Sequence, residues 1–168
     1  NPVKKKIGLV FIPRDYYVPL QCHDGVCETG AMDKLTHAGL YGVEVSQATI
    51  ENILGVDINY NIRINFDTLT TMVDALGGID INSDQDVDLL HGAGCNIKQG
   101  ENHVDGRCAL GFARERYAYN AGDRHRGENQ QEVIRAMINK MTTTNIIKNY
   151  ESILNAVQGM FQTKYENR

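Results

Sequence analysis

The chain contains 168 residues with a mass of 18.8 kDa, enough for one domain with its own hydrophobic core. Hydrophobic residues make up 42% and charged residues 23%, which excludes a disordered tail, a collagen-like repeat and a coiled coil. The formal net charge of -4 and the pI of about 5.7 argue against a general nucleic-acid-binding protein. No apolar run approaches the roughly 20 residues of a membrane-spanning helix.

The arginines are unevenly distributed along this acidic chain. Five of the nine fall within twenty residues: Arg107, Arg114, Arg116, Arg124 and Arg126. The acidic residues gather elsewhere, notably at Asp84, Asp86 and Asp88. That acidic run resembles the start of a calcium loop, but it lacks the following glycine and the distal glutamate, so we expect a solvated loop. A local arginine cluster in an acidic protein indicates a specific anionic ligand.

The first third of the chain predicts a strand, a loop and a helix. Residues 3–12 predict a buried strand, because residues 7–12 are nearly continuously apolar. Pro13 is expected to stop this strand. Residues 21–33 predict a loop. A helix is expected to begin near Ser46, whose side chain can cap free amides, and to end at Gly55.

The middle of the chain alternates strand and helix signals. Residues 58–64 alternate between apolar and polar side chains, which predicts a strand. Asp67 is expected to cap a helix that residues 77–78 close. A short strand follows from Ile79.

The last third predicts helices. Asp105 is expected to cap one helix, and two more are expected over 128–142 and 145–161. The first helix should bury Cys108, Ala109, Phe112 and Ala113, and the second should be lined by Val133, Ile134, Met137, Ile138 and Met141. Strands alternating with helices predict a single α/β domain over 1–168, with a mixed β-sheet covered by helices on both faces.

The four cysteines are Cys22, Cys27, Cys95 and Cys108, and they allow three pairings if all are bridged. Three interpretations remain open: disulfides in an exported protein, buried free thiols, or a metal site. Their spacing matches no zinc ribbon. Local pairing of Cys22 with Cys27 and of Cys95 with Cys108 is the simplest arrangement, because each closes a short loop.

The usual catalytic motifs are missing, and the arginines are what remains. Residues two apart in a helix point about 200° away from each other, so Arg114 and Arg116 can face one ligand only if the helix ends near Arg114 and the chain continues extended. Guanidinium groups suit phosphate because their planar fork donates two parallel hydrogen bonds. The alternative is surface ion pairing with Glu115 and Asp123.

Five short words in order along the chain give a family resemblance. They are residues 12–15 (IPRD), 33–38 (DKLTHA), 73–79 (VDALGGI), 109–116 (ALGFARER), and a last one made of 122–123 (GD) followed by 130–134 (QQEVI). Together they resemble the LytR-CpsA-Psr family of bacterial cell-envelope proteins, over about residues 1–143.

The resemblance implies a phosphotransferase on the extracellular face of the cytoplasmic membrane of a bacterium, anchored by an N-terminal helix. Such proteins transfer a glycopolymer of teichoic acid or capsular type from a polyprenyl-pyrophosphate carrier to peptidoglycan. Two alternatives remain: a non-catalytic module that binds polyprenyl phosphates, and the transcriptional attenuator that gave the family its first label. Nucleic acid is not an expected partner.

The resemblance also assigns site residues. By position it places Arg14, Lys34, Arg114, Arg116, Arg126 and Gln130 around the pyrophosphate, with Arg14, Arg114 and Arg116 as the catalytic residues. Asp15 adjoins Arg14 and either orients it or caps a strand end. We therefore expect Arg14, Arg114, Arg116 and Arg126 to converge on one cleft. Arg107 and Arg124 fall outside the words and are expected to be solvated surface residues.

Two departures from the family pattern have consequences. Asn129 stands where the family often has a second arginine. The family's Arg-Ser-Asp word, whose carboxylate helps to hold Mg²⁺, would precede residue 1. The expectation is therefore that one or two N-terminal strands and the main Mg²⁺ ligand are missing from this chain, which would weaken or abolish catalysis.

Overall fold

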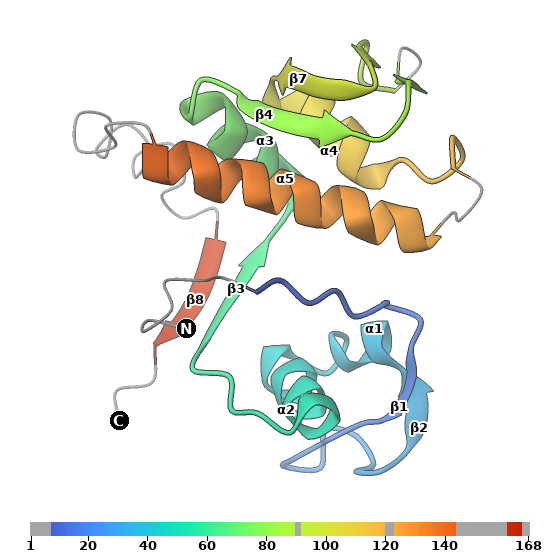
Figure 1. Cartoon of the computed structure of the whole chain (residues 1–168). Helices are drawn as coiled ribbons and strands as arrows, with labels where there is room; N and C mark the ends of the chain where they lie inside the picture. The colour runs from blue at the N-terminus through green and yellow to red at the C-terminus, as the bar shows by residue number, and fades with distance from the viewer. Residues whose placement is uncertain (1–7, 90–91, 120–122, 144–160, 166–168) are drawn as a thin grey trace. The chain divides into compact units, whose positions relative to one another are not determined.

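The computed structural model describes residues 8–89, 92–119, 123–143 and 161–165 (Figure 1). The chain divides into two compact units: Asn1–Phe11 with Arg63–Gln162, and Ile12–Ile62 with Thr163–Arg168. Helices and strands alternate in both, which confirms the predicted α/β class. The described strands form four two-stranded pairs, one of them between β3 (Tyr60–Ile64) and β8 (Phe161–Tyr165). A single domain stays a prediction.

The second unit is a small α/β body around a disulfide. Its elements are β1 (Tyr17–Pro19), β2 (Met32–Lys34), α1 (Leu35–Ala38) and α2 (Val43–Leu54), and the two strands are antiparallel. Val18, Leu20, Ala38 and Val45 form its core.

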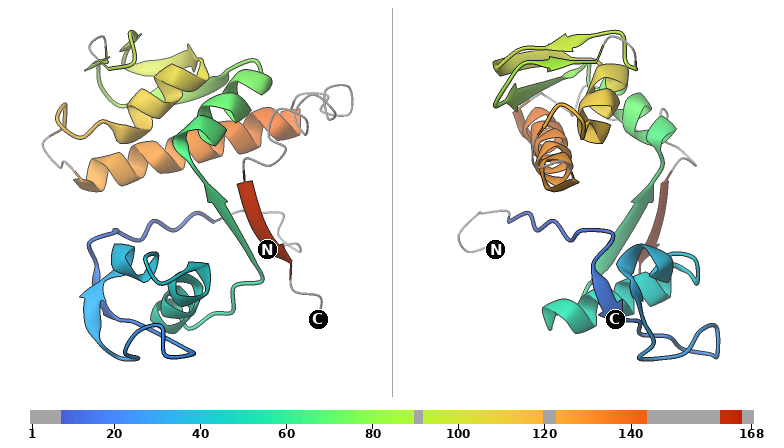
Figure 2. Two further views of the ribbon diagram at one scale, coloured as in Figure 1. Left: turned by 180° about the vertical axis from the view of Figure 1, so that it is seen from behind. Right: turned by 90° about the vertical axis from the view of Figure 1, so that its right-hand side faces the viewer.

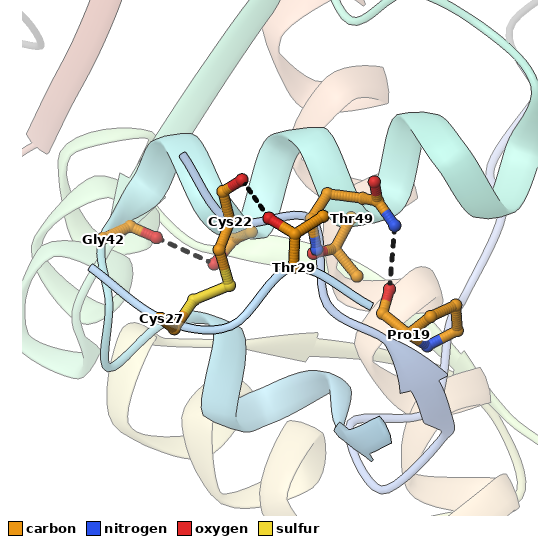
Figure 3. Close-up of a disulfide and its surroundings, with 8 residues drawn as sticks. Pro19, Cys22, Cys27, Thr29, Gly42 and Thr49 are labelled. Carbon is orange, nitrogen blue, oxygen red and sulfur yellow. Dashed lines mark hydrogen bonds between the residues drawn. A yellow bond between two sulfur atoms is a disulfide. The ribbon is translucent and has the colours of Figure 1, made fainter. Parts of the chain in front are cut away.

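The loop between β1 and β2 is closed by the predicted Cys22–Cys27 disulfide, whose Cα atoms lie 5.4 Å apart (Figure 3). The Thr29 hydroxyl donates to the carbonyl of Cys22 at 2.6 Å. The backbone N–H of Gln21 donates to the buried Thr49 hydroxyl on α2 at 3.0 Å. The loop is therefore fixed both to itself and to the helix.

The first unit is built around one antiparallel strand pair. Its elements are α3 (Phe66–Ala75), β4 (Ile79–Ser83), β5 (Val87–Asp88), β6 (Asn96–Ile97), β7 (Gly100–Val104), α4 (Gly106–Arg114) and α5 (Asp123–Thr143). β4 pairs with β7, from Ile79 opposite Val104 to Ser83 opposite Gly100. Ile79 and Ile81 are fully buried, whereas the alternate residues of β4 are exposed. Both Figure 1 and Figure 2 show α3, α4 and α5 gathered beside this pair.

The buried face of helix α4 contains the residues that the sequence predicts for it. Its buried side chains are Cys108, Ala109, Phe112 and Ala113, as the sequence predicts. Asp105 caps the helix, accepting the N–H of Cys108 at 2.8 Å. The helix begins against α3: the N–H of Gly106 donates to Asp74 at 2.7 Å, and a Cβ at Gly106 would collide with the backbone of Thr70.

Two predicted helix starts are wrong. Asn65, not Asp67, caps α3, because its side chain accepts the N–H of Thr68 at 2.8 Å. Ser46 lies inside α2, where its hydroxyl donates to the carbonyl of Gly42 at 3.2 Å. Both errors have one cause: polar residues that can cap a helix also fit its first turns, so the sequence alone leaves the start ambiguous.

Two further predictions differ from the structure, and a third, the helix over 145–161, falls almost wholly outside the described residues. Residues 8–12 form no strand; Val10 is exposed, and an apolar run becomes a strand only with a ladder partner. The helix predicted from residue 128 starts at Asp123 and leaves Ile134 and Met141 exposed. Residues 3–7 and 145–160 lie outside the described residues, and Phe161 belongs to β8. Among the described helices, none combines the length and hydropathy of a membrane span.

Candidate functional site

The candidate site lies at the C-terminal end of α4. Arg114 is the last residue of this helix, and Glu115 is extended, with φ -64° and ψ 133°. The predicted condition for Arg114 and Arg116 to face one ligand is thereby met, because the helical rotation stops between them. Arg114 also complements the negative end of the helix dipole.

Two amide side chains from α5 bond to the end of α4. Asn129, 4% exposed, donates through Nδ2 to the carbonyl of Phe112 at 3.1 Å and to the Tyr119 hydroxyl at 3.3 Å. Gln130 donates through Nε2 to the carbonyl of Ala113 at 3.3 Å. The last carbonyls of a helix have no partner within it, so these bonds satisfy two of them and fix the residue before Arg114.

The position of Arg126 follows from the same contacts. It lies one helical turn before Gln130 on α5 and is half-buried. Residues four apart in a helix are neighbours on its surface, and Gln130 contacts the carbonyl next to Arg114. The structure therefore places the turn from Arg126 to Gln130 beside the end of α4.

Glu115 organises the segment between the two arginines and the following loop. Its Oε1 accepts the backbone N–H groups of Arg116 at 2.9 Å, Tyr117 at 2.5 Å and Ala118 at 2.9 Å. Three backbone donors on one carboxylate oxygen hold the loop in a tight turn. The role expected for Glu115 in the alternative interpretation was side-chain ion pairing, whereas these bonds show backbone anchoring.

Aromatic rings support both guanidinium groups. The Arg114 Cζ lies 4.8 Å from the ring centroid of Phe66, and the Arg116 Cζ lies 4.7 Å from that of Tyr117. Arg116 also donates to the Tyr117 hydroxyl at 2.5 Å. Cation–π contacts of this kind restrict the orientation of the guanidinium without neutralising its charge.

Arg14, Asp15 and Lys34 form a cluster in the second unit. The Asp15 carboxylate lies 3.1 Å from the Lys34 ammonium and 3.6 Å from Nε of Arg14. The hydrogen bond from Lys34, with the charges of Lys34 and Arg14, lowers the pKa of Asp15. Asp15 therefore bridges two predicted site residues, in line with an orienting role. The convergence of Arg14 with the arginines of the first unit stays a prediction.

The two arginines expected on the surface differ. Arg124 is 84% exposed and pairs with Glu128 at 3.4 Å, as a solvated residue should. Arg107 is exposed as well, but it also lines a cavity of about 390 Å³ together with Arg114. Arg107 lies about two helical turns before Arg114, on the same face of α4.

A buried aromatic contact next to Arg126 was missed by the sequence reasoning. The rings of Tyr119 and His125 stack with centroids 3.6 Å apart, and His125 lies 3.3 Å from both Asp84 and Glu128. Burial raises the pKa of the Tyr119 phenol. No spacing rule predicts this contact, because His125 belongs to α5 and Tyr119 lies outside it.

The described residues do not supply a metal site. Nowhere in them do three or more His, Cys, Asp or Glu side chains gather in a way that could hold a metal ion. In the acidic run, Asp86 bonds the Lys98 ammonium at 2.9 Å and the N–H of Gln99 at 2.8 Å, and these bonds lower its pKa. The carboxylates near the arginines are also engaged, Glu115 by backbone and Asp15 by Lys34. The residues described here therefore do not fit Mg²⁺ by themselves.

An α/β body that presents arginines from the end of one helix and the adjacent turn of another matches the family suggested by the five words. The LytR_cpsA_psr family model matches residues 1–168, so the chain belongs to this family, and the match extends beyond the expected residue 143.

The similar proteins are transferases by name. The polyisoprenyl-teichoic acid–peptidoglycan teichoic acid transferases TagU of Bacillus cereus and Enterococcus faecalis are 37% and 34% identical to the chain, over 97% of its length. The chain spans about half, 51%, of each of these relatives.

Solved structures resemble the chain over most of its length. The protein gbs0355 from Streptococcus agalactiae has a TM-score of 0.78 and 29% identity, covering 92% of this chain and 54% of the other. Bacillus subtilis TagU has a TM-score of 0.72 and 29% identity, covering 92% and 64%. A structure of TagT bound to LI-WTA has a TM-score of 0.71 and 26% identity, covering 92% and 56%.

Proposed function

We propose that the protein containing this chain is a phosphotransferase that moves a glycopolymer of teichoic acid type from a polyprenyl-pyrophosphate carrier to peptidoglycan. The observation that carries this proposal is the end of α4, where Arg114 and Arg116 emerge on either side of an extended Glu115 beside Arg126 and Gln130. The names of the relatives, which are teichoic acid transferases, support the same substrate class.

The reaction is a displacement at phosphorus. An acceptor hydroxyl oxygen bonds to the phosphorus that carries the glycopolymer, and the bond from this phosphorus to the bridging oxygen breaks. Polyprenyl phosphate leaves, and the hydroxyl proton passes to solvent. Negative charge grows on the leaving phosphate, and fixed guanidinium groups stabilise it without needing a proton transfer.

Each predicted residue has a distinct part in this proposal. Arg114 and Arg116 bind the diphosphate, and their aromatic contacts orient them for it. Arg126 adds a third positive charge. Gln130 is a positioning residue, because its amide donates to the end of α4. Arg14 and Lys34, oriented by Asp15, are proposed to bind the same diphosphate.

Localisation and partners follow as proposals from the family and the disulfides. Cys22–Cys27 and Cys95–Cys108 both form, as predicted by local pairing. Disulfides persist in oxidising compartments, which supports a site of action outside the cytoplasm. A membrane anchor and peptidoglycan as partner remain part of the proposal. That Mg²⁺ takes part in the reaction is proposed from the family alone.

A transfer assay tests the proposed function. The full natural protein that contains this chain is incubated with a polyprenyl-pyrophosphate-linked polymer carrying a radiolabel and with purified peptidoglycan. The proposal predicts label bound to peptidoglycan through a phosphodiester, and release of polyprenyl phosphate. Tight binding of the lipid without any transfer, under conditions where a TagU relative transfers, would identify a binding module instead.

A further inference from the structure

A cavity of about 390 Å³ opens beside Arg114, on the face of α4 away from the core. Four of its lining residues are Arg107, Leu110, Gly111 and Arg114, which are spaced three, four and seven apart and so share one helix face. The core-facing residues of α4 are a different set, Cys108, Ala109, Phe112 and Ala113. One face of helix α4 therefore packs into the core, and the opposite face lines this cavity.

The opposite wall of the cavity comes from the segment between β5 and β6. Leu89, Gly92 and Ala93 line it, and the carbonyl of Leu89 accepts the N–H of Ala93 at 2.8 Å and of Gly94 at 3.0 Å. The Cys95–Cys108 disulfide ties the end of this wall to α4. Gly111 allows the close approach, because a Cβ there would collide with the Ala93 side chain. This wall of the cavity is therefore fixed to α4 by a disulfide and internally by hydrogen bonds.

The polar groups around the cavity are balanced in charge. Arg107 and Arg114 are cationic and donate hydrogen bonds only, whereas Asp88 and Glu115 are anionic and accept only. Two positive and two negative side chains give no preference for a polyanion. They do match a neutral ligand whose hydroxyl groups both donate and accept.

The apolar lining adds a second preference. Half-buried Leu110 supplies aliphatic surface, and Tyr117, 82% exposed, supplies an aromatic ring at the rim. An aromatic ring beside converging donors and acceptors suits a flat apolar face that carries polar groups around its edge. A sugar ring has both features, and the volume of the cavity is in the range of small-molecule sites.

We propose that this cavity binds an uncharged sugar ring of the acceptor glycan, next to the diphosphate held by Arg114. This assignment rests on the proposed function, and it extends that function by separating the two substrates. The anionic polymer and its carrier belong with the positive charge of Arg114, Arg116 and Arg126. The rest of the cavity, where Arg107 faces the two acidic residues Asp88 and Glu115, carries no net positive charge, so the neutral glycan belongs there. Arg107 then becomes a residue that binds the acceptor.

Direct binding measurements test the assignment without requiring turnover. The probe is N,N′-diacetylchitobiose, a neutral disaccharide of N-acetylglucosamine, titrated by NMR into the full chain. Inorganic pyrophosphate and a glycerol phosphate oligomer are titrated separately. The variants are Arg107→Gln and Tyr117→Ser, both at exposed positions where the fold should tolerate change, with Arg124→Gln as the matched control. Thermal unfolding of each variant checks its fold.

The proposal predicts that chitobiose shifts resonances of Leu110 and Ala93. Its Kd should rise about fivefold or more in Arg107→Gln and in Tyr117→Ser, the effect of losing one hydrogen bond or ring contact, and should stay unchanged in Arg124→Gln. Absence of chitobiose binding, equal affinity in all variants, or occupation of the cavity by the glycerol phosphate oligomer instead would each overturn it. If the parent chain binds pyrophosphate but not chitobiose, this inference alone is rejected. If the parent chain binds neither, the proposed function is rejected as well.

Discussion

A guanidinium and an ammonium carry the same charge but differ in the geometry of their donors, and this difference matters at Arg114 and Arg116. Lysine at either position keeps the positive charge and loses the fork that binds two phosphate oxygens at once. If both arginines stabilise the diphosphate in the transition state, each substitution should lower the transfer rate about ten- to a hundredfold, from about 1.5–3 kcal/mol of lost stabilisation.

The control for these lysine variants is Arg124→Lys, because Arg124 is highly exposed and paired only with its neighbour Glu128 in the contacts observed here. Its transfer rate should match that of the parent protein, and urea unfolding of all three variants should show little change in the free energy of unfolding. Equal transfer rates in the three variants would show that Arg114 and Arg116 are surface residues without a role in the transfer reaction.

Asn129 stands where the family often has arginine, and the structure gives it a structural role. Its side chain is buried and donates to the carbonyl of Phe112 and to Tyr119. Asn129→Ala would remove both bonds and leave the Phe112 carbonyl with only the N–H of Glu115, at 3.3 Å, so we expect a loss of about 1–3 kcal/mol in the free energy of unfolding by urea denaturation. Asn82→Ala, at an exposed position on β4, should change it by less than about 0.5 kcal/mol. A matching small loss at Asn129 would show that these bonds do not stabilise the end of α4.

For single residues, the sequence indicated which side chains belong to the site better than it indicated the contacts that each of them makes. The condition that the helix ends at Arg114 follows from the angular step of a helix and is confirmed. The role of Gln130 in bonding the carbonyl of Ala113 was not predictable, because it depends on how α5 packs against α4. The cavity that Arg107 lines was not predictable for the same reason, since its other wall includes Ala93, some fifteen residues earlier in the chain.

The elements of the first unit are joined by a disulfide whose contribution to stability can be calculated. Cys95–Cys108 encloses a loop with a sequence separation of 13, for which the chain-entropy model gives about 3 kcal/mol. The double variant Cys95→Ala/Cys108→Ala should therefore lose about that much free energy of unfolding. The shorter Cys22–Cys27 loop, with a separation of 5, should contribute about 2 kcal/mol. The reverse order of the two losses in urea denaturation would contradict this account.

The contact between β4, β7 and α5 predicts a pH dependence. Asp80 bonds His103 on β7 at 2.5 Å and lies 3.7 Å from the Lys140 ammonium on α5. The hydrogen bond from His103, with the charge of Lys140, lowers the pKa of Asp80 below its usual 3.8. A carboxylate with a lowered pKa stabilises the fold above pH 3.8, and this stabilisation is lost as the pH falls through the lowered value.

Asp80→Asn should therefore destabilise the protein near pH 5 in urea unfolding, and the difference from the parent should shrink below the lowered pKa of Asp80. A difference that stays constant down to strongly acidic pH would show that the carboxylate charge is not what joins these elements. The double variant Asp80→Asn/His103→Gln should lose less than the sum of the two single variants, because each removes the same contact.

At the scale of elements, the types were predicted well and the boundaries less so. The alternation in 58–64 and the inward face of α4 are periodic signals, and both elements are present. Helix starts failed where several capping residues are close together, as at Asn65 and Asp67. The strand predicted over 3–12 failed in its described part, 8–12, because hydrophobicity indicates burial and not a hydrogen-bonding partner.

The whole molecule consists of two compact units, each carrying part of the predicted site. Arg14 belongs to the second unit and Arg114 to the first. If both bind one diphosphate, the single variants Arg14→Gln and Arg114→Gln should each weaken pyrophosphate binding. Their double variant should deviate from additivity by about 0.5 kcal/mol or more in isothermal titration calorimetry. Strict additivity, or normal binding in Arg14→Gln, would assign the diphosphate to the first unit alone.

The proposed function depends above all on whether the arginines at the junction of α4 and α5 hold a polyprenyl diphosphate. The most direct test is native mass spectrometry of the full natural protein purified from a bacterial membrane. We expect a bound polyprenyl phosphate or diphosphate in the parent protein and its loss in Arg114→Gln/Arg116→Gln, with both proteins folded. The same lipid retained in the double variant, or no lipid in the parent after incubation with a polyprenyl diphosphate, would contradict it.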